Sequence, residues 1–199
     1  MNKPGPWSVI GVALPALLTV QGAWAGPPTD QLKPAVERVI RLLQDPALKR
    51  ETKTAERRGT IRTVSDGIFD WREMAKRSLG PHWRGRTEAE REEFVGLFRD
   101  LLERSYISII ERYSGERITY SGDSIDGAQA VVRTKFLTKQ GKDASIDYRM
   151  VRHGDHWLIY DVLVENVGLV SNYRSQFNQI IRTSSFEELV KKMRNHDLV

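Results

Sequence analysis

The chain has 199 residues, with 31 lysines and arginines against 26 aspartates and glutamates, and it has no cysteine. The lack of cysteine excludes disulfides, thiol catalysis, cysteine-ligated zinc and anchoring through a lipidated cysteine. The net charge of +5 arises from interspersed basic and acidic residues without an aromatic-basic motif, which argues against a nucleic-acid partner.

The N-terminal segment has the layout of a secretory signal peptide. Lys3 is the only charged residue before Asp30, a mostly apolar run covers residues 9–20, and Ala23-Trp24-Ala25 places small residues on both sides of one position. The run is shorter than the roughly 20 residues that a membrane-spanning helix needs. We therefore expect a cleaved signal peptide over residues 1–25 and a single exported domain over residues 26–199. An uncleaved membrane anchor is the alternative.

Two helices are expected in the first part of this domain. Apolar residues at helical spacing predict the first helix over residues 34–43, namely Val36, Val39, Ile40 and Leu43. The Asp45-Pro46 pair ends it. A highly charged second helix is expected over residues 47–64. Its apolar positions are so sparse that we expect it to lie at the surface.

Two capping boxes begin the next helices. Asp70-x-x-Glu73 begins a compact helix that ends at Gly80-Pro81, and Thr87-x-x-Glu90 begins a long helix that ends at Gly115. The long helix carries one apolar stripe, made of Phe94, Leu97, Phe98, Leu101, Leu102, Tyr106, Ile109, Ile110 and Tyr113. This stripe is longer than one small sheet usually covers.

The period then changes to that of β-structure. Strands are expected over residues 118–120, 130–138, 145–151 and 157–164, with hairpin turns at Gln140-Gly141 and Gly154-Asp155. A helix over residues 169–181 and a last helix begun by Ser184-x-x-Glu187 complete the chain. The predicted fold class is α+β, with several helices packed against one side of a curved antiparallel sheet of about four strands. The pattern leaves open whether the interior is solid or encloses an apolar cavity.

The polar residues carry no reaction signature. His153 and His156 flank the Gly154-Asp155 turn, and we interpret them as an exposed hairpin tip and expect no metal or other cofactor. Asp161 interrupts an otherwise apolar strand, so it needs a hydrogen-bonding partner, and a structural role is favoured. An enzyme would require Asp161 and His82 to converge in a pocket. No nucleophile, phosphate-loop or dinucleotide motif is present, which on its own is weak evidence against an enzyme.

The segment 160–177, YDVLVENVGLVSNYRSQF, resembles the MlaC family, the periplasmic lipid-binding component of the Mla transport system. This family is also described as the toluene-tolerance auxiliary component of an ABC transporter. The resemblance covers roughly residues 60–194. Shorter matches fall in the family's order at Phe69-Asp-x-x-x-Met-Ala75, Leu79-Gly80 with His82-Trp83, Thr87-x-x-x-Arg91-x-x-Phe94 and Phe186-Glu-Glu-Leu189.

This resemblance implies a deep apolar cavity that holds phospholipid acyl chains. It implies a carrier without enzyme activity, most simply a monomer, that moves lipid between an outer-membrane lipoprotein complex and an inner-membrane ABC transporter with a periplasmic ring. Relatives occur beside hopanoid genes, so a hopanoid or another hydrophobic ligand is one alternative. An adaptor that docks on the transporter without carrying lipid is another.

For such a carrier, we expect lipid to contact the apolar stripe of the long helix and the inward faces of the strands. The predicted lipid-binding residues are Phe98, Leu101, Leu102, Tyr106, Val132, Phe136, Ile146, Tyr148, Val162 and Val164. Three further residues, Val167, Leu169 and Tyr173, are expected to border the mouth after the last strand. The alternative role for each is ordinary packing in a core.

Overall fold

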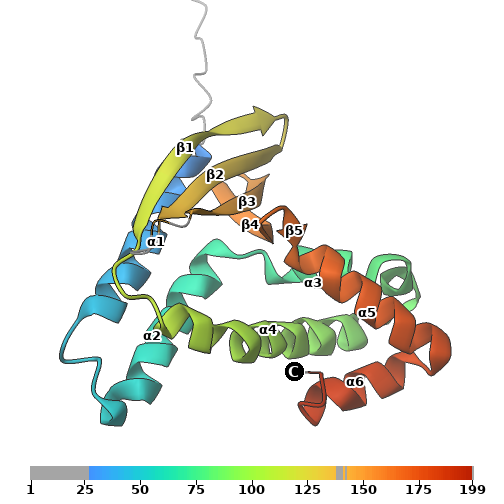
Figure 1. Cartoon of the computed structure of the whole chain (residues 1–199). Coiled ribbons are helices and arrows are strands. Elements are labelled where there is room, and N and C mark those ends of the chain that lie inside the picture. The colour runs from blue at the N-terminus through green and yellow to red at the C-terminus, as the bar shows by residue number, and fades with distance from the viewer. Residues whose placement is uncertain (1–26, 138–140, 142, 199) are drawn as a thin grey trace, which may run out of the picture.

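The computed structural model describes residues 27–137, 141 and 143–198. Within these residues, six α-helices and one five-stranded antiparallel sheet confirm the predicted α+β class (Figure 1). The predicted signal peptide lies outside the described residues, as does Gln140 of the first predicted hairpin turn. No helix in the described ranges is long and apolar enough to cross a membrane.

The helices follow the predicted order with shifted ends. They are α1 (Pro28–Gln44), α2 (Thr54–Ile68), α3 (Trp71–Leu79), α4 (Glu88–Glu111), α5 (Leu169–Thr183) and α6 (Phe186–Arg194), with 3-10 turns at Glu51–Lys53 and Gly80–Gly85. The box at Thr87 is reciprocal, as predicted. The box at Asp70 is one-sided, because the backbone N–H of Asp70 donates to Ile159 on the sheet (2.8 Å).

The predicted cap of the last helix was wrong by one residue. Ser185, not Ser184, is the N-cap of α6, and its hydroxyl accepts the backbone N–H of Glu188 (3.1 Å). Two serines precede two glutamates here, so the spacing of three fits either pair, and the backbone conformation decides between them.

The sheet is a meander in which neighbours along the chain pair in space. Its strands are β1 (Arg117–Asp126), β2 (Gln129–Leu137), β3 (Asp143–His153), β4 (His156–Val164) and β5 (Val167–Gly168). The first strand is much longer than residues 118–120, and β5 was not predicted. The register of β1 shifts between Tyr120 and Gly122, where Gly122 has a φ of 107° that favours glycine.

Two large apolar clusters and a small one, made of Leu43, Ile61 and Ile107, hold the described part of the chain together. The main core joins α3, α4, α5 and α6, where Phe94 and Phe98 each meet Phe177 edge-on with ring centroids 5.7 Å apart. A second cluster joins α1 to the sheet through buried Leu32, Val132 and other residues. Figure 1 shows α1 behind the sheet and the remaining long helices below it.

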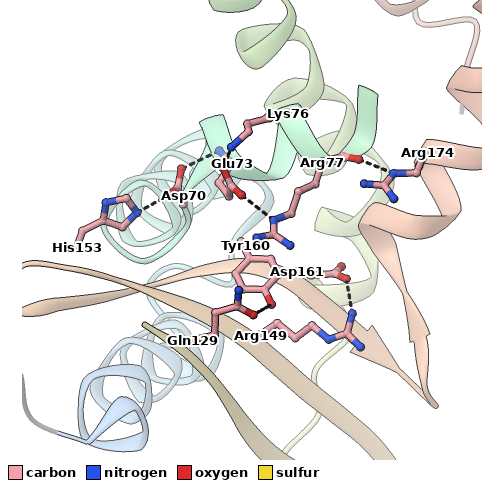
Figure 2. Close-up of polar contacts among 10 residues, drawn as sticks. All are labelled: Asp70, Glu73, Lys76, Arg77, Gln129, Arg149, His153, Tyr160, Asp161 and Arg174. Atoms are coloured by element: carbon pink, nitrogen blue, oxygen red, sulfur yellow. Dashed lines mark hydrogen bonds and ion pairs between the residues drawn. The ribbon is translucent and has the colours of Figure 1, made fainter. Parts of the chain in front are cut away.

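A polar joint connects β4 to α3 and α5 (Figure 2). The register of β4 shifts at Tyr160, so Ile159 and Val162 face the α1 side of the sheet while Asp161 contacts α5. Asp161 is 4% exposed and accepts the backbone N–H of Val170 (3.0 Å). Burial raises the pKa of Asp161, and the bond from Val170 and nearby Arg149 oppose that rise. Helices therefore contact both faces of the sheet at β4, not one side alone.

The hairpin tip also takes part in this joint. The ring nitrogen Nε2 of His153 lies 2.8 Å from Oδ2 of Asp70, the residue that caps α3. His153 was expected only at an exposed turn. The tip is exposed as predicted, and the contact of His153 with Asp70 also ties the β3–β4 hairpin to the start of α3 (Figure 2).

The joint leaves no room for a side chain at Gly168. A Cβ there would lie 2.9 Å from Oδ2 of Asp161 and 3.1 Å from the hydroxyl of Ser171. We expect Gly168→Ala to lower the free energy of unfolding by about 1–3 kcal/mol, measured by urea denaturation. Gly96→Ala is the matched control, because open space surrounds Gly96 in α4 and alanine there should add roughly 0.5–1 kcal/mol. Equal effects of the two substitutions would contradict the packing argument.

Candidate functional site

An apolar pocket of about 610 Å³ lies between the sheet and helices α1, α2 and α4. This size is typical of small-molecule sites. Helix α1 contributes Val36, Val39, Ile40 and Leu43 to the lining, and α4 contributes Leu102, Tyr106, Ile107, Ile109 and Ile110, with Tyr113 just after its end. The sheet contributes Ile118, Phe136, Ile146, Tyr148, Val162 and Val164. The interior is therefore not filled by the protein's own side chains.

One half of the apolar stripe of α4 packs in the main core, and the other half lines the pocket. Its N-terminal half, with Phe94, Phe98 and Leu101 all at 0% exposure, packs in the main core against α5 and α6. The C-terminal half lines the pocket, and there Ile109 and Ile110 are 52% and 38% exposed. Such exposure of large aliphatic side chains marks the rim where the pocket opens to solvent.

Most of the predicted site residues come together at this pocket. Those that line it are Leu102, Tyr106, Phe136, Ile146, Tyr148, Val162, Val164 and Leu169. They come from α4, from three strands and from the start of α5, so only the fold brings them into one site.

The other predicted site residues do not line the pocket. Phe98, Leu101 and Tyr173 belong to the main core, and Val132 belongs to the cluster under α1. Val167 is 62% exposed on β5. An apolar stripe shows which residues avoid water, but not whether a neighbouring helix or an empty space covers them.

The sequence interpretation missed the walls formed by α1 and α2. Helix α2 was expected at the surface, yet Ile61 and Val64 are buried, and Ile61 and Ile68 line the pocket. Spacings of three and four between these residues were the available signal. The signal was weak because charged residues occupy most of the rest of α2.

Ion pairs join α2 to α4 along one wall, which we call the α2–α4 seam. Three sets of pairs form it: Asp66 with Arg99 (2.8 Å), Arg62 with Asp100 (3.6 Å) and Glu103, and Arg57 and Arg58 with Glu111 (2.6 and 2.7 Å). The pairing sequence shows that the two helices run antiparallel. Arg58, Arg62, Arg99 and Glu103 also line the pocket, so its wall is charged but internally neutralised.

The apolar part of the pocket stays uncharged near neutral pH. Burial raises the pKa of Tyr106 to about 12, with a further contribution from nearby Tyr173. Burial also raises the pKa of Tyr148. Both phenols are therefore neutral where a carrier would work, and they add weak polarity without charge.

The site offers no converging acid–base pair. Asp161 is bound to Val170 and faces Arg149, while Nε2 of His82 lies 3.0 Å from Oδ1 of Asn178. Neither Asp161 nor His82 lines the pocket. Among the residues that the structure describes, no group of three or more potential ligands could hold a metal ion.

Residues 33–195 match the family of MlaC proteins. The chain belongs to the MlaC family. This confirms the resemblance of segment 160–177, and the family consists of non-enzymatic, periplasmic lipid-binding proteins.

Two relatives show how far the likeness extends. The intermembrane phospholipid transport system binding protein MlaC of Haemophilus influenzae is 22% identical over 120 residues, or 58% of this chain and 56% of that protein. The match thus spans little more than half the length of that relative. A phospholipid-binding protein from Ralstonia solanacearum, solved in complex with a phospholipid, has the same fold with a TM-score of 0.72 and 21% identity. That comparison covers 85% of this chain and 96% of the other.

The α2–α4 seam makes stability depend on pH. The hydrogen bond from Arg58, opposed by partial burial and reinforced by Arg57, lowers the pKa of Glu111 below 4.5. A carboxyl with a lowered folded-state pKa adds stability that is complete above its unfolded pKa and disappears as the pH falls through the folded value. We therefore expect Glu111→Gln to destabilise the protein most at neutral pH, with the difference shrinking as the pH falls below 4.5.

Urea unfolding of both proteins across this range measures the effect. Glu51→Gln is the control, because Glu51 is exposed and forms no ion pair within the described part of the chain. A gap between wild type and Glu111→Gln that does not change with pH would contradict the argument.

Proposed function

We propose that this protein is a periplasmic lipid carrier that holds the acyl chains of a phospholipid in the pocket between the sheet, α1, α2 and α4. The observation that carries the proposal is the apolar pocket of about 610 Å³ in a chain of the MlaC family. The Ralstonia solanacearum protein of the same fold binds a phospholipid, which supports this choice of ligand.

The energetics of acyl chains suit a carrier that needs no chemical step. Two acyl chains carry roughly 30 methylenes, and each contributes about 0.8 kcal/mol on leaving water, so shelter is favoured by on the order of 20 kcal/mol. A bilayer shelters the chains about equally well. Small differences between docked and free states can therefore direct loading and release, while escape through water stays slow.

The partners follow from the same proposal. An extracytoplasmic carrier would collect or deliver lipid at an outer-membrane lipoprotein complex and at an inner-membrane ABC transporter with a periplasmic ring. The expected signal peptide over residues 1–25 would bring it to the periplasm, where a monomer is the simplest form for a shuttle. One alternative is an adaptor, which needs only docking surfaces and no pocket. The other is a carrier of a hopanoid or another hydrophobic ligand, which needs a pocket. The pocket therefore favours a carrier over an adaptor.

We assign lipid contact to the residues that line the pocket. From the predicted set these are Leu102, Tyr106, Phe136, Ile146, Tyr148, Val162, Val164 and Leu169, joined by residues of α1 and α2. Phe98, Leu101, Val132 and Tyr173 would support the lining from behind, because they are buried in the two clusters.

The protein should retain lipid through purification. We expect native mass spectrometry of protein prepared without detergent to show a bound species, and extraction of that species to identify a phospholipid. A hopanoid or another apolar ligand would appear in the same measurement as a different mass. A ligand-free mass together with no uptake from liposomes would rule out the carrier and leave the adaptor.

A charge at the pocket rim should weaken binding. Ile110→Glu places a carboxylate on the lining at a position that is already 38% exposed, so the fold should tolerate it. We expect about tenfold weaker uptake of phospholipid from liposomes, because the acyl chains would bury or displace that charge. Ile125→Glu is the matched control, since Ile125 is 55% exposed on β1 and does not line the pocket. Equal loss in both variants would argue against this pocket as the site.

A further inference from the structure

The α2–α4 seam is a wall of the pocket that ion pairs close. Its side chains are partly solvated, with Asp66, Arg62 and Asp100 at 39%, 44% and 46% exposure. These exposed pairs, unlike the more buried pair of Arg57 with Glu111, contribute little to stability, because water and salt compete with them. Behind them lies only a small apolar cluster of Leu43, Ile61 and Ile107.

The other walls are anchored more firmly. Helix α1 is fixed to the sheet by buried Leu32, and hydrogen bonds join Thr29 to Asp123 (2.7 Å) and Gln31 to Trp157 (2.8 Å). The N-terminal half of α4 is embedded in the main core. Helix α2 is tied to the sheet at its C-terminal end, where Phe69 pairs with Ile159. Its N-terminal part is held to α4 mainly by the pairs with Glu111 and by the small cluster.

The volume of the pocket does not match two acyl chains. A cavity of about 150 Å³ can hold the six carbons of benzene, which corresponds to about 25 Å³ per carbon. At that density, the pocket of about 610 Å³ takes about two dozen carbons. One acyl chain fits with space to spare, whereas two chains with roughly 30 methylenes exceed it.

We propose that the α2–α4 seam sets the capacity of the pocket: closed, it admits one acyl chain, and parted, it admits the second chain of a diacyl lipid. This inference rests on the proposed function. It assigns Asp66, Arg62, Arg99, Asp100 and Glu103 a part in choosing between single-chain and two-chain lipids. The ion pairs suit this task, because charged side chains that separate are rehydrated, whereas a parted apolar seam would expose its surface to water.

Cross-linking the seam tests the proposal directly. The chain has no cysteine, so Arg62→Cys with Asp100→Cys creates a unique pair across the outer side of the seam. A bifunctional methanethiosulfonate reagent closes this pair, and a reductant opens it again. The control pair, Arg72→Cys with Glu92→Cys, replaces an exposed ion pair between α3 and α4 that does not line the pocket.

The readout is uptake of lysophosphatidylcholine compared with dioleoylphosphatidylcholine, measured by native mass spectrometry before and after reduction. We expect the cross-linked seam to lower uptake of the two-chain lipid at least about tenfold, with full recovery on reduction, and to leave the single-chain lipid within about twofold. The control cross-link should change neither lipid. Retained uptake of the single-chain lipid shows that the cross-linked protein is folded.

Other outcomes separate the two hypotheses. Equal uptake of both lipids by the cross-linked and reduced protein overturns the capacity role and leaves the carrier intact. Failure of the wild-type chain to take up either lipid overturns the proposed function itself. Loss of both lipids on cross-linking shows that the seam acts on entry as a whole, which also contradicts a role in capacity.

A loosened seam gives an independent test. Arg62→Gln removes the contacts to Asp100 and Glu103, and we expect it to speed uptake of the two-chain lipid about threefold or more, with little effect on the single-chain lipid. Arg72→Gln is the control, because Arg72 pairs with Glu88 and Glu92 away from the pocket. The same response in both variants contradicts the inference.

Discussion

Helix α4 is longer than the core that can cover it, and the rest of the structure depends on this mismatch. Its first half is buried by α5 and α6 around Phe94 and Phe98. Beyond Leu102, α1 and α2 cover α4 only partly, at Ile107, and the rest of the apolar face lines the pocket. Apolar residues of a helix that extend beyond the core need another apolar surface or a ligand to shield them from water. In this molecule, that apolar face lines the pocket.

The space persists because the sheet meets the helical layer mainly along β4. Asp161 caps the start of α5 from the sheet, and Gly168 allows the two backbones to approach closely. Arg77 lies over the ring of Tyr160 at 4.0 Å and reinforces the same joint (Figure 2). The contacts along β4 fix the orientation of the sheet over α4. The far side of the sheet, at β1, can therefore lie away from α4. Asp161, which interrupts the apolar strand β4, thus helps to position the sheet over the pocket.

Sequence patterns were reliable wherever one local rule decided the outcome. The caps at Asp70 and Thr87 and the order of helices and strands follow from spacing alone. The patterns failed where tertiary context decided. A stripe could not distinguish Leu101, which lies only in the main core, from Leu102, which belongs to that core and also lines the pocket. Strand β1 was underestimated because most of its residues are exposed, so it lacks an apolar signature beyond its first residues.

The sequence interpretation also missed α2 as a wall of the pocket, because α2 is highly charged. A helix whose apolar positions are sparse is normally a surface helix. Here Arg62 of α2 meets Glu103 of α4, and Asp66 of α2 meets Arg99 of α4, so the charges close one wall of the pocket without filling it. Apolar side chains at these positions would collapse into the space and convert it to solid core, because dry aliphatic groups gain contact by closing any gap. Paired charges resist that collapse, since burying them without full hydrogen bonding is costly. The charged side chains of the α2–α4 seam are costly to bury, so they keep the pocket from collapsing. For the same reason, water can hydrate them when α2 and α4 separate.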